Sequence, residues 1–466
     1  MYPRLLRQTV QEYKALASRH RWEINLIRRV LIIPFVVSPL LFFKTVIDSN
    51  PLALNSIIEV DEKSCTLAKA IVNANDSIDG HFFPECAPGN PQGADTIVLK
   101  NDVLLTTPFV PDYFGATGLP LVSSEITIEG NGHSIVRDHQ VDDFRLLTNT
   151  GDGRLTIKNV ILRRGSSGSF RVGGAIWNKG GDLTIINSTI HGNKASGGAG
   201  IFSGPGKLVL INSTISGNTA EQFGGGIAVD FGTVHIINST ITGNEVEAGF
   251  GGGITLNSIS GIEVNITNSV ISGNIAYSAS TTPVVGSAEI HSADEGAIVS
   301  SYYNVFSHAE LTTEKAFTGF IPDSNDINAS SNSSTPYALD QILNTSLDFN
   351  GGSTLTHALV PHSPAIDFSP SSDCEGLTDQ RGLLRNFDGD GLLSANECDT
   401  GAFEYGHEIP PTATPTLEPT MTTTPLPSPT TTITHTPEPS STPTVIPTVP
   451  IDSWYVALPL ILKAHN

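Results

Sequence analysis

Residues 183–193 read LTIINSTIHGN, and close copies of this phrase follow at intervals of 25 to 30 residues. The copies are LVLINSTISGN at 208–218, VHIINSTITGN at 234–244 and VNITNSVISGN at 264–274, with a degenerate LTIKNVILRRG at 155–165. A repeat of this length is the sequence signature of a solenoid or an array of small structural units. The repeat therefore decides the fold class.

Each repeat contains short alternating runs rich in Ile, Val, Leu and Thr, separated by Gly, Asn and Ser. Such runs are typical of strands, and the residues between them are typical of turns. Helical solenoids are excluded because no repeat contains an amphipathic helix of ordinary length. The sequence predicts an all-β chain, folded as a right-handed parallel β-helix with about 25 residues per coil and a rise of roughly 4.8 Å per coil.

Two sets of residues recur with the repeat. Ile176, Ile201, Ile227 and Ile254 follow the glycine phrases, and we expect them to form one inward-facing file. Asn187, Asn212, Asn238 and Asn268 are 25, 26 and 30 residues apart. Asparagine accepts left-handed turn geometry, and its amide can bond the same amide one coil away, which predicts an asparagine ladder. The alternative, that N-S-T marks glycosylation sites, explains the period less well.

The composition limits the classes of partner that the chain is expected to bind. Of the 466 residues only 15% are charged, and 46 acidic against 25 basic side chains give a formal net charge of −21. Nucleic acid is excluded as an expected partner, because its binding needs clustered Lys and Arg. An acidic surface is compatible with divalent cations and with solubility outside the cell.

The four cysteines form two local pairs by position, Cys65 with Cys86 and Cys374 with Cys398. Their spacing does not match a zinc site. Two disulfides would close loops of about 20–25 residues near the two ends of the solenoid, each adding roughly 3 kcal/mol. Reduced cysteine pairs are the alternative, but disulfides and an exported chain are favoured.

The first fifty residues predict export. A basic stretch over 1–29 precedes the apolar run VLIIPFVVSPLLFF at 30–43, as in a secretory signal. The run is shorter than the roughly 20 residues of a spanning helix. We therefore expect residues 1–50 to contact the membrane during export, and the sequence leaves open whether they are removed or stay as an anchor.

Residues 51–100 do not repeat, and a short helix-like piece, SCTLAKAIVNAND at 64–76, predicts a cap on the first coil. Cys65 to Ile71, followed by Asn73-Ala74-Asn75, resembles the signature of the CSLREA domain, which begins exported bacterial β-helix proteins. Ala68 and Lys69 replace the Arg-Glu of that signature.

The coils of residues 101–310 resemble polymorphic outer membrane protein repeats. The matching marks are Gly173-Gly174-Ala175-Ile176 and the Gly-Asn endings at Asn193, Asn218, Asn244 and Asn274. This resemblance implies an architecture and no activity.

Residues 311–406 combine further coils with a segment that resembles the choice-of-anchor Q domain. The match is carried by Asn350, Gly351, Gly352, Thr354, His357, Ser363, Pro364, Ala365, Ile366, Asp367, Asp379, Gln380, Arg381, Gly382, Gly401, Ala402, Phe403 and Glu404. The resemblance implies export and attachment to the cell surface, and it brings no catalytic residues. We expect Asp379, Arg381 and Asp399 to form ion pairs that hold an irregular end cap.

The C-terminal residues have two parts. Residues 407–450 are rich in Pro and Thr, which predicts a linker without a core. Residues 451–466 include the apolar stretch WYVALPLILKAHN, too short to span a membrane as a helix. A sorting or docking tail is the favoured role, and a strand packed on the body is the alternative.

One loop has the spacing of a calcium site. Asn386, Asp388, Asp390, Ser394 and Glu397 take positions 1, 3, 5, 9 and 12 of a twelve-residue calcium loop, with Gly391 at the turn. The flanking helices of an EF-hand are absent from the pattern, so a polar turn closed by the second disulfide is the alternative. The sequence requires no cofactor, and Ca²⁺ is its one candidate ligand ion.

These features together favour a non-catalytic protein of the cell surface, whose partners are the cell envelope, extracellular glycans or other surfaces. The alternative is a polysaccharide lyase or glycoside hydrolase of the pectate-lyase-like kind. The acidic residues of the coils, such as Asp182, Asp230, Glu245, Glu247 and Glu263, do not share one phase of the repeat. Three or more acidic residues that converge in a groove with a Lys or Arg would favour the enzyme.

Overall fold

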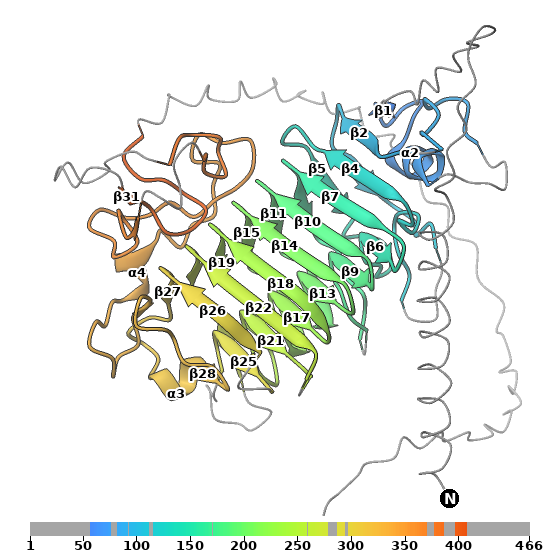
Figure 1. The fold of residues 1–466 in the computed structure, drawn as a ribbon. Coiled ribbons are helices and arrows are strands. Elements are labelled where there is room, and N and C mark those ends of the chain that lie inside the picture. The colour runs from blue at the N-terminus through green and yellow to red at the C-terminus, as the bar shows by residue number, and fades with distance from the viewer. Residues whose placement is uncertain are drawn as a thin grey trace, which may run out of the picture. The chain divides into compact units, whose positions relative to one another are not determined.

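The chain is a parallel β-helix (Figure 1). The computed structural model describes residues 56–75, 82–91, 93–110, 115–169, 171–258, 260–277, 287–293, 297–370, 377–385 and 397–407. The predicted signal segment, the Pro/Thr-rich linker and the apolar tail lie outside these ranges. Within them, no helix combines the length and the apolar character needed to cross a membrane.

Four parallel sheets run along the solenoid, each taking one strand from successive coils. Sheet A contains β1 (Ser56–Val60), β2 (Asp95–Leu99), β4 (Glu125–Glu129), β7 (Arg154–Lys158), β10 (Asp182–Ile186), β14 (Lys207–Ile211), β18 (Gly232–Ile237), β22 (Ile262–Thr267) and β26 (Ile298–Tyr302). Sheet B contains β3 (Val103–Leu105), β5 (Ser134–Arg137), β8 (Ile161–Arg163), β11 (Thr189–His191), β15 (Thr214–Ser216), β19 (Thr240–Thr242), β23 (Val270–Ile271), β27 (Val305–Phe306) and β29 (Ile327–Asn328).

Two shorter sheets complete the coils. Sheet C contains β12 (Lys194–Gly197), β16 (Thr219–Phe223), β20 (Glu245–Val246) and β24 (Ile275–Ala276). Sheet D contains β6 (Leu147–Thr150), β9 (Ile176–Lys179), β13 (Ile201–Ser203), β17 (Ile227–Val229), β21 (Ile254–Leu256), β25 (Ile290–Ser292) and β28 (Phe317–Thr318).

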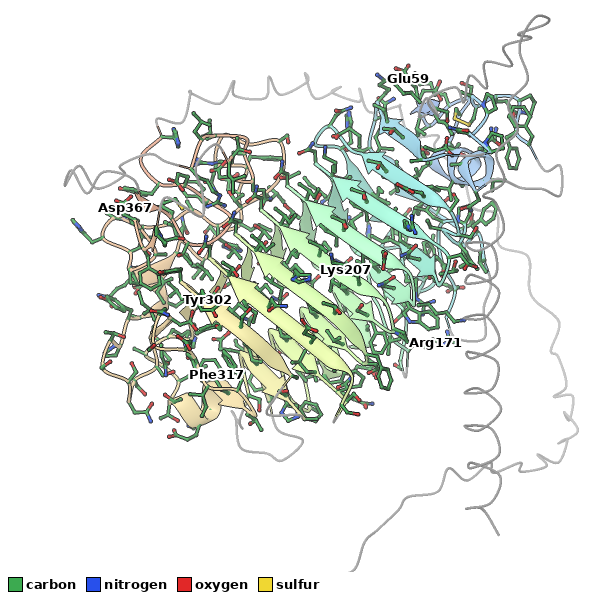
Figure 2. All side chains as sticks on the ribbon, viewed as in Figure 1. Glu59, Arg171, Lys207, Tyr302, Phe317 and Asp367 are labelled. Carbon is green, nitrogen blue, oxygen red and sulfur yellow. A yellow bond between two sulfur atoms is a disulfide. The ribbon has the colours of Figure 1, made fainter. Side chains whose placement is uncertain are left out.

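Alternation within each strand separates the core from the surface, because successive side chains of a strand point to opposite faces. The predicted isoleucine file is confirmed: Ile176, Ile201, Ile227 and Ile254 are partners in register in sheet D, and each is at most 2% exposed. On the outer face of sheet A, Lys207 and Tyr302 are exposed (Figure 2).

The turn from sheet A to sheet B uses an asparagine in the left-handed region, as expected. The φ angles are 50° at Asn187, 47° at Asn212, 49° at Asn238 and 49° at Asn268. The predicted ladder between these four amides is wrong. Asn212 Nδ2 donates to Thr378 O, Asn268 Oδ1 accepts from Ser369 Oγ, and the Oδ1 atoms of Asn187 and Asn238 have no partner. The left-handed turn points the amide of each of these asparagines away from its equivalents in the coils above and below.

An asparagine ladder does exist, six residues further along each repeat, at Asn193, Asn218, Asn244 and Asn274. Each Nδ2 donates to the Oδ1 of the next asparagine at 2.9 Å, and each of these Oδ1 atoms also accepts the backbone N–H one coil earlier. These side chains are at most 1% exposed, so only a partner inside the solenoid can satisfy them. Glu289 ends the ladder by accepting from Asn274 Nδ2 at 2.7 Å.

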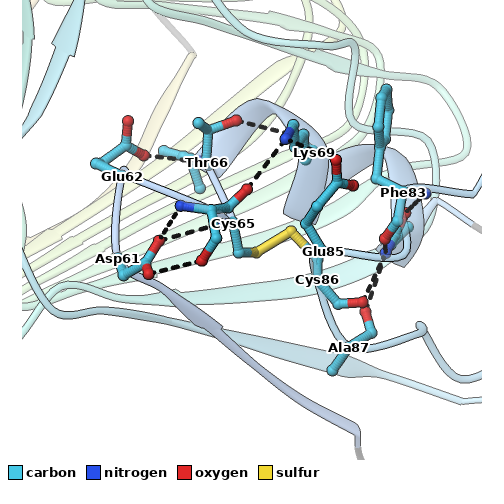
Figure 3. Close-up of a disulfide and its surroundings, with 12 residues drawn as sticks. Asp61, Glu62, Cys65, Thr66, Lys69, Phe83, Glu85, Cys86 and Ala87 are labelled. Atoms are coloured by element: carbon cyan, nitrogen blue, oxygen red, sulfur yellow. Dashed lines mark hydrogen bonds and ion pairs between the residues drawn. A yellow bond between two sulfur atoms is a disulfide. The ribbon is translucent and has the colours of Figure 1, made fainter.

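The N-terminal end of the solenoid is covered by α2 (Leu67–Ala74), which buries Leu67, Ala70 and Ile71. A disulfide joins Cys65, just before the helix, to Cys86 (Figure 3). Asp61 supports the turn by accepting from the backbone N–H groups of Ser64 and Cys65. The predicted capping helix and its disulfide are therefore present.

The C-terminal segment lies along the side of the solenoid, over sheet B, and not on its end as the sequence predicts. We call residues 344–370, 377–385 and 397–407 the clamp; it follows α3 (Thr313–Ala316) and α4 (Leu339–Ile342), and it includes the antiparallel pair β30 (Ser369–Pro370) and β31 (Glu397–Cys398). Gln380 bonds Thr189 at 3.1 Å and Thr214 at 2.7 Å, and Ala402 N donates to Thr240. The clamp thus spans three successive coils.

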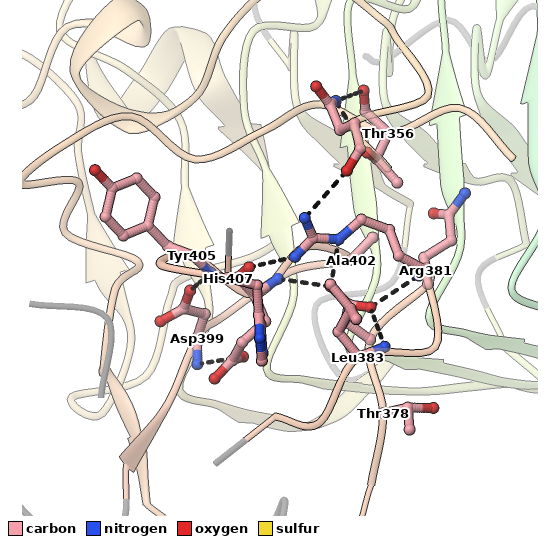
Figure 4. Close-up of polar contacts among 12 residues, drawn as sticks. Thr356, Thr378, Arg381, Leu383, Asp399, Ala402, Tyr405 and His407 are labelled. Atoms are coloured by element: carbon pink, nitrogen blue, oxygen red, sulfur yellow. Dashed lines mark hydrogen bonds and ion pairs between the residues drawn. The ribbon is translucent and has the colours of Figure 1, made fainter. Parts of the chain in front are cut away.

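Buried charges hold the clamp together. The guanidinium group of Arg381 (Figure 4) pairs with Asp379 at 2.7 Å. It also lies over the Phe403 ring, 3.6 Å from the ring centroid. Arg385 is fully buried, lies 3.7 Å from Glu404, and donates to carbonyls of both clamp and solenoid. The expected ion pair thus forms between Asp379 and Arg381, but Asp399 joins none among the described residues. Its carboxylate instead accepts the backbone N–H groups of Asp367 and Tyr405. Cys398 is disulfide-bonded, and its predicted partner Cys374 lies outside the described residues.

The amide ladder predicts a large effect of removing one rung. Asn218→Ala deletes two bonds donated by Nδ2, to Ile190 O and Asn244 Oδ1, and two bonds accepted from Asn193. We expect the free energy of unfolding to fall by roughly 2–4 kcal/mol, because buried groups are left unsatisfied. Urea unfolding of the full chain measures this. Asn265→Ala, on the outer face of sheet A, is the matched control, and an equal loss in both variants would contradict the ladder.

Glu289 predicts a pH dependence. Burial raises its pKa from an ordinary 4.5 to about 8, although N–H groups of Asn274 and Gly273 oppose this. Between these values the unfolded chain releases the proton and the folded chain keeps it, so stability falls as pH rises. Glu289→Gln cannot ionise, so it removes this pH-dependent loss of stability. The difference in unfolding free energy between variant and wild type should grow from pH 4.5 to 8, by roughly 5 kcal/mol at most. A difference independent of pH would show that Glu289 ionises normally.

Candidate functional site

A groove on the outer face of sheet C brings together charged side chains from separate coils. Its volume is about 180 Å³, and it is lined by Asp143, Ser166, Gly168, Ser169, Lys194, Ala195, Thr219, Glu221 and Glu247. Three carboxylates and one ammonium group therefore share a surface that is otherwise lined by hydroxyls and small residues.

Strand register places these side chains. Ala195, Ala220, Val246 and Ala276 are partners across sheet C and point inward, where they form a small buried cluster. Their chain neighbours consequently point outward. Glu221 and Glu247 follow Ala220 and Val246, so their backbones are one coil apart, roughly 4.8 Å.

Hydrogen bonds and ion pairs fix part of the lining. Ser169 Oγ donates to Glu221 Oε1 at 2.8 Å. Asp143 lies 3.3 Å from Arg137, whose Nη1 also donates to the carbonyls of Asp138 and Val141 and so orders the loop that carries Asp143. Among the described residues, no three His, Cys, Asp or Glu side chains are placed to hold a metal ion. The carboxylates line the groove and do not converge on one point.

Aromatic residues follow the acidic positions along the chain. Phe223 stands two residues after Glu221 at the end of β16, and its backbone forms a parallel bridge with that of Phe250 in the next coil. The ring of Phe223 lies 6.5 Å from that of Phe202, and the ring of Phe250 lies 4.1 Å from that of His291. Phe250 is 38% exposed. Of these rings Phe202 is buried, whereas Phe223 and Phe250, which follow Glu221 and Glu247 by two and three residues, are partly exposed.

Two larger pockets offer less chemistry. One of about 450 Å³ lies between β26 and residues 319–323, and Asp323 is the one charged residue among its described lining residues. Another, of about 310 Å³, lies beside β3 at the N-terminal end, where Glu62 is the one charged residue in the described part of the lining. The smaller groove on sheet C is the better candidate because it alone gathers acidic and basic groups among these three pockets.

The calcium prediction is untested. Asn386, Asp388, Asp390 and Ser394 lie outside the described residues, as does the side chain of Glu397. Ca²⁺ binding by this loop therefore stays a prediction.

Sequence reasoning named Glu247, but missed Glu221 and the groove. The signal was available: Glu221 and Glu247 each stand three residues after a ladder asparagine, Asn218 and Asn244. The charged residues of the stretch around Asp143 have different positions in the structure. Arg145 is fully buried and donates to the carbonyls of Gly115 and Val172, while Asp143 faces the groove.

No family model and no curated protein sequence matches the chain. Among solved structures, the crystal structure of pectate lyase Pel9A is similar, at 17% sequence identity and a TM-score of 0.35, over 67% of this chain and 88% of that chain. A similarity this low carries no information about a substrate. The CSLREA, polymorphic outer membrane protein and choice-of-anchor Q resemblances stay predictions.

Proposed function

We propose that this protein is an exported β-helix of the cell surface that binds a glycan along the groove of sheet C. The observation that carries the proposal is the groove that Asp143, Lys194, Glu221 and Glu247 line together, with the partly exposed Phe223 and Phe250 close by along the same coils. Carboxylates, ammonium groups and hydroxyls bond sugar hydroxyls, and aromatic rings pack against the apolar faces of sugars. Because the lining residues come from successive coils, an extended chain parallel to the axis fits the groove best.

The charge of the groove limits the ligand. Three carboxylates face one ammonium group among the lining residues. Like charges across an interface cost free energy. A neutral glycan or one with amino sugars is therefore favoured over a polyuronate.

Three sequence features and one disulfide support export and surface display. The chain has a basic flank before a short apolar run, and a Pro/Thr-rich stretch follows the β-helix. The Cys65–Cys86 disulfide fits an oxidising compartment. The resemblance to the choice-of-anchor Q domain supports the same location.

Glycan cleavage is the second candidate, favoured by the same groove. A polysaccharide lyase needs clustered acidic residues with a Lys or Arg as base, and a hydrolase needs paired carboxylates. Retaining hydrolases place two carboxyl groups about 5–5.5 Å apart, and Glu221 and Glu247 lie on neighbouring coils. One could then act as acid and the other as nucleophile.

The test uses the full chain with a panel of neutral, amino-sugar and uronate polysaccharides. For the binding function we expect retention on a neutral or amino-sugar polymer without product release. The double variant Glu221→Gln/Glu247→Gln should weaken binding about tenfold or more, equivalent to about 1.4 kcal/mol. Phe250→Ala should weaken it without changing the charge. Isothermal titration calorimetry measures both.

Glu263→Gln, on the outer face of sheet A, is the charge-matched control and should leave binding unchanged. Release of reducing ends that Glu247→Gln abolishes would instead establish the enzyme. If no polymer in the panel is bound and none is cleaved, both proposed functions are excluded.

A further inference from the structure

A second cluster of polar residues lies on the outer face of sheet B, at the border of the clamp. Arg163, His191 and Ser216 are partners in register on β8, β11 and β15. His357 of the clamp completes the group, with Nε2 at 2.8 Å from Ser216 Oγ. Arg163 and His191 are half-buried and the adjacent Arg164 is exposed, so the cluster reaches solvent on one side.

The hydrogen bonds of His357 are complete. Its Nδ1 lies 2.8 Å from the carbonyl oxygen of Asn344, which can only accept, so Nδ1 carries the proton. In the neutral ring Nε2 then accepts the hydroxyl proton of Ser216. Ser216 and His357 are thereby satisfied by each other and hold the clamp against β15.

The neighbouring nitrogens are not satisfied. Arg163 Nε and His191 Nε2 are buried and have no hydrogen-bond partner within the part of the chain that the structure describes. Such groups cost roughly 1–3 kcal/mol each when left unpaired. Since Arg163 Nε–H can only donate, an acceptor is the missing partner.

The charge around these nitrogens has one sign. Burial, followed by the charges of Arg163, Arg164 and His357, lowers the pKa of His191 to about 4. Among the described residues, no carboxylate forms an ion pair with Arg163 or Arg164. In a chain with 46 acidic against 25 basic side chains, two adjacent arginines without an acidic partner are unexpected.

We propose that Arg163, Arg164 and His191 form a binding site for a doubly charged oxyanion, sulfate or phosphate. The planar guanidinium groups match the oxygens of a tetrahedral anion, and the anion supplies the acceptor that Arg163 lacks. The site is on a different sheet from the glycan groove and does not depend on it. The anion could be free or carried on a sulfated or phosphorylated sugar.

Thermal unfolding of the full chain tests the site. Sodium sulfate and sodium phosphate should each raise the midpoint by several degrees over sodium chloride at equal ionic strength, because a ligand of the folded state stabilises it. Arg163→Gln should abolish the extra shift. Arg164→Asn should reduce it, and Asn accepts the left-handed backbone of this position, where φ is 62°. Arg154→Gln, which removes an exposed ion pair on sheet A, is the control and should retain the extra shift of the unfolding midpoint.

A spectroscopic readout separates binding from general salt effects. The pKa of His191, followed by NMR of its ring proton, should rise when sulfate binds and stay constant in chloride. A sulfated or phosphorylated oligosaccharide that binds more tightly than the inorganic ion would identify the carried form as the ligand, and equal affinity would identify the free ion. An equal response to sulfate and chloride, or an unchanged sulfate response in both Arg163→Gln and Arg164→Asn, would overturn the proposal.

Discussion

The whole structure depends on the hydrogen-bonded register between successive coils. Once β10 pairs with β14, and β14 with β18, each side chain lies next to its equivalent one coil away. An interior side chain must then pack against, or bond to, the equivalent side chain of the next coil. Isoleucine meets this condition by packing and asparagine by bonding its own kind, because an amide is both a donor and an acceptor. The amide ladder stops at Glu289, whose two carboxyl oxygens accept from the backbone of Gly273 and from the backbone and side chain of Asn274.

The same register explains which predictions from sequence succeeded. The isoleucine file follows from the period alone, since any parallel stacking of 25-residue coils aligns Ile176 with Ile201. The period does not say which of two asparagines in each repeat points inward. Asn187 and Asn193 recur equally well, and only the left-handed turn at Asn187 assigns the ladder to Asn193. Periodicity thus fixed the neighbours of each residue, and local backbone geometry fixed its direction.

The clamp could not be predicted in the same way. Its bonds to the solenoid join residues far apart in sequence, for example Ser216 with His357 and Thr189 with Gln380, at separations of 141 and 191 residues. No repeat relates such pairs. Motif resemblance marked many of the right residues, but not the surface they cover. The repeated threonines on the outer face of sheet B were one available sign of a polar contact on this side. In the structure Thr189, Thr214 and Thr240 lie under the clamp and are at most 3% exposed.

The regular solenoid also determines where specific chemistry can arise. Sheets A and B repeat closely, so a side chain that differs from its neighbours is conspicuous there. Sheet C has only four strands, and its outward positions change from Lys194 to Thr219 to Glu245 along one row. Its inner positions hold only Ala and Val, which constrains the core while leaving the outer row free to vary. A surface of this kind can acquire a ligand without disturbing the stacking, which is the physical reason to look for function at sheet C and at the border of the clamp.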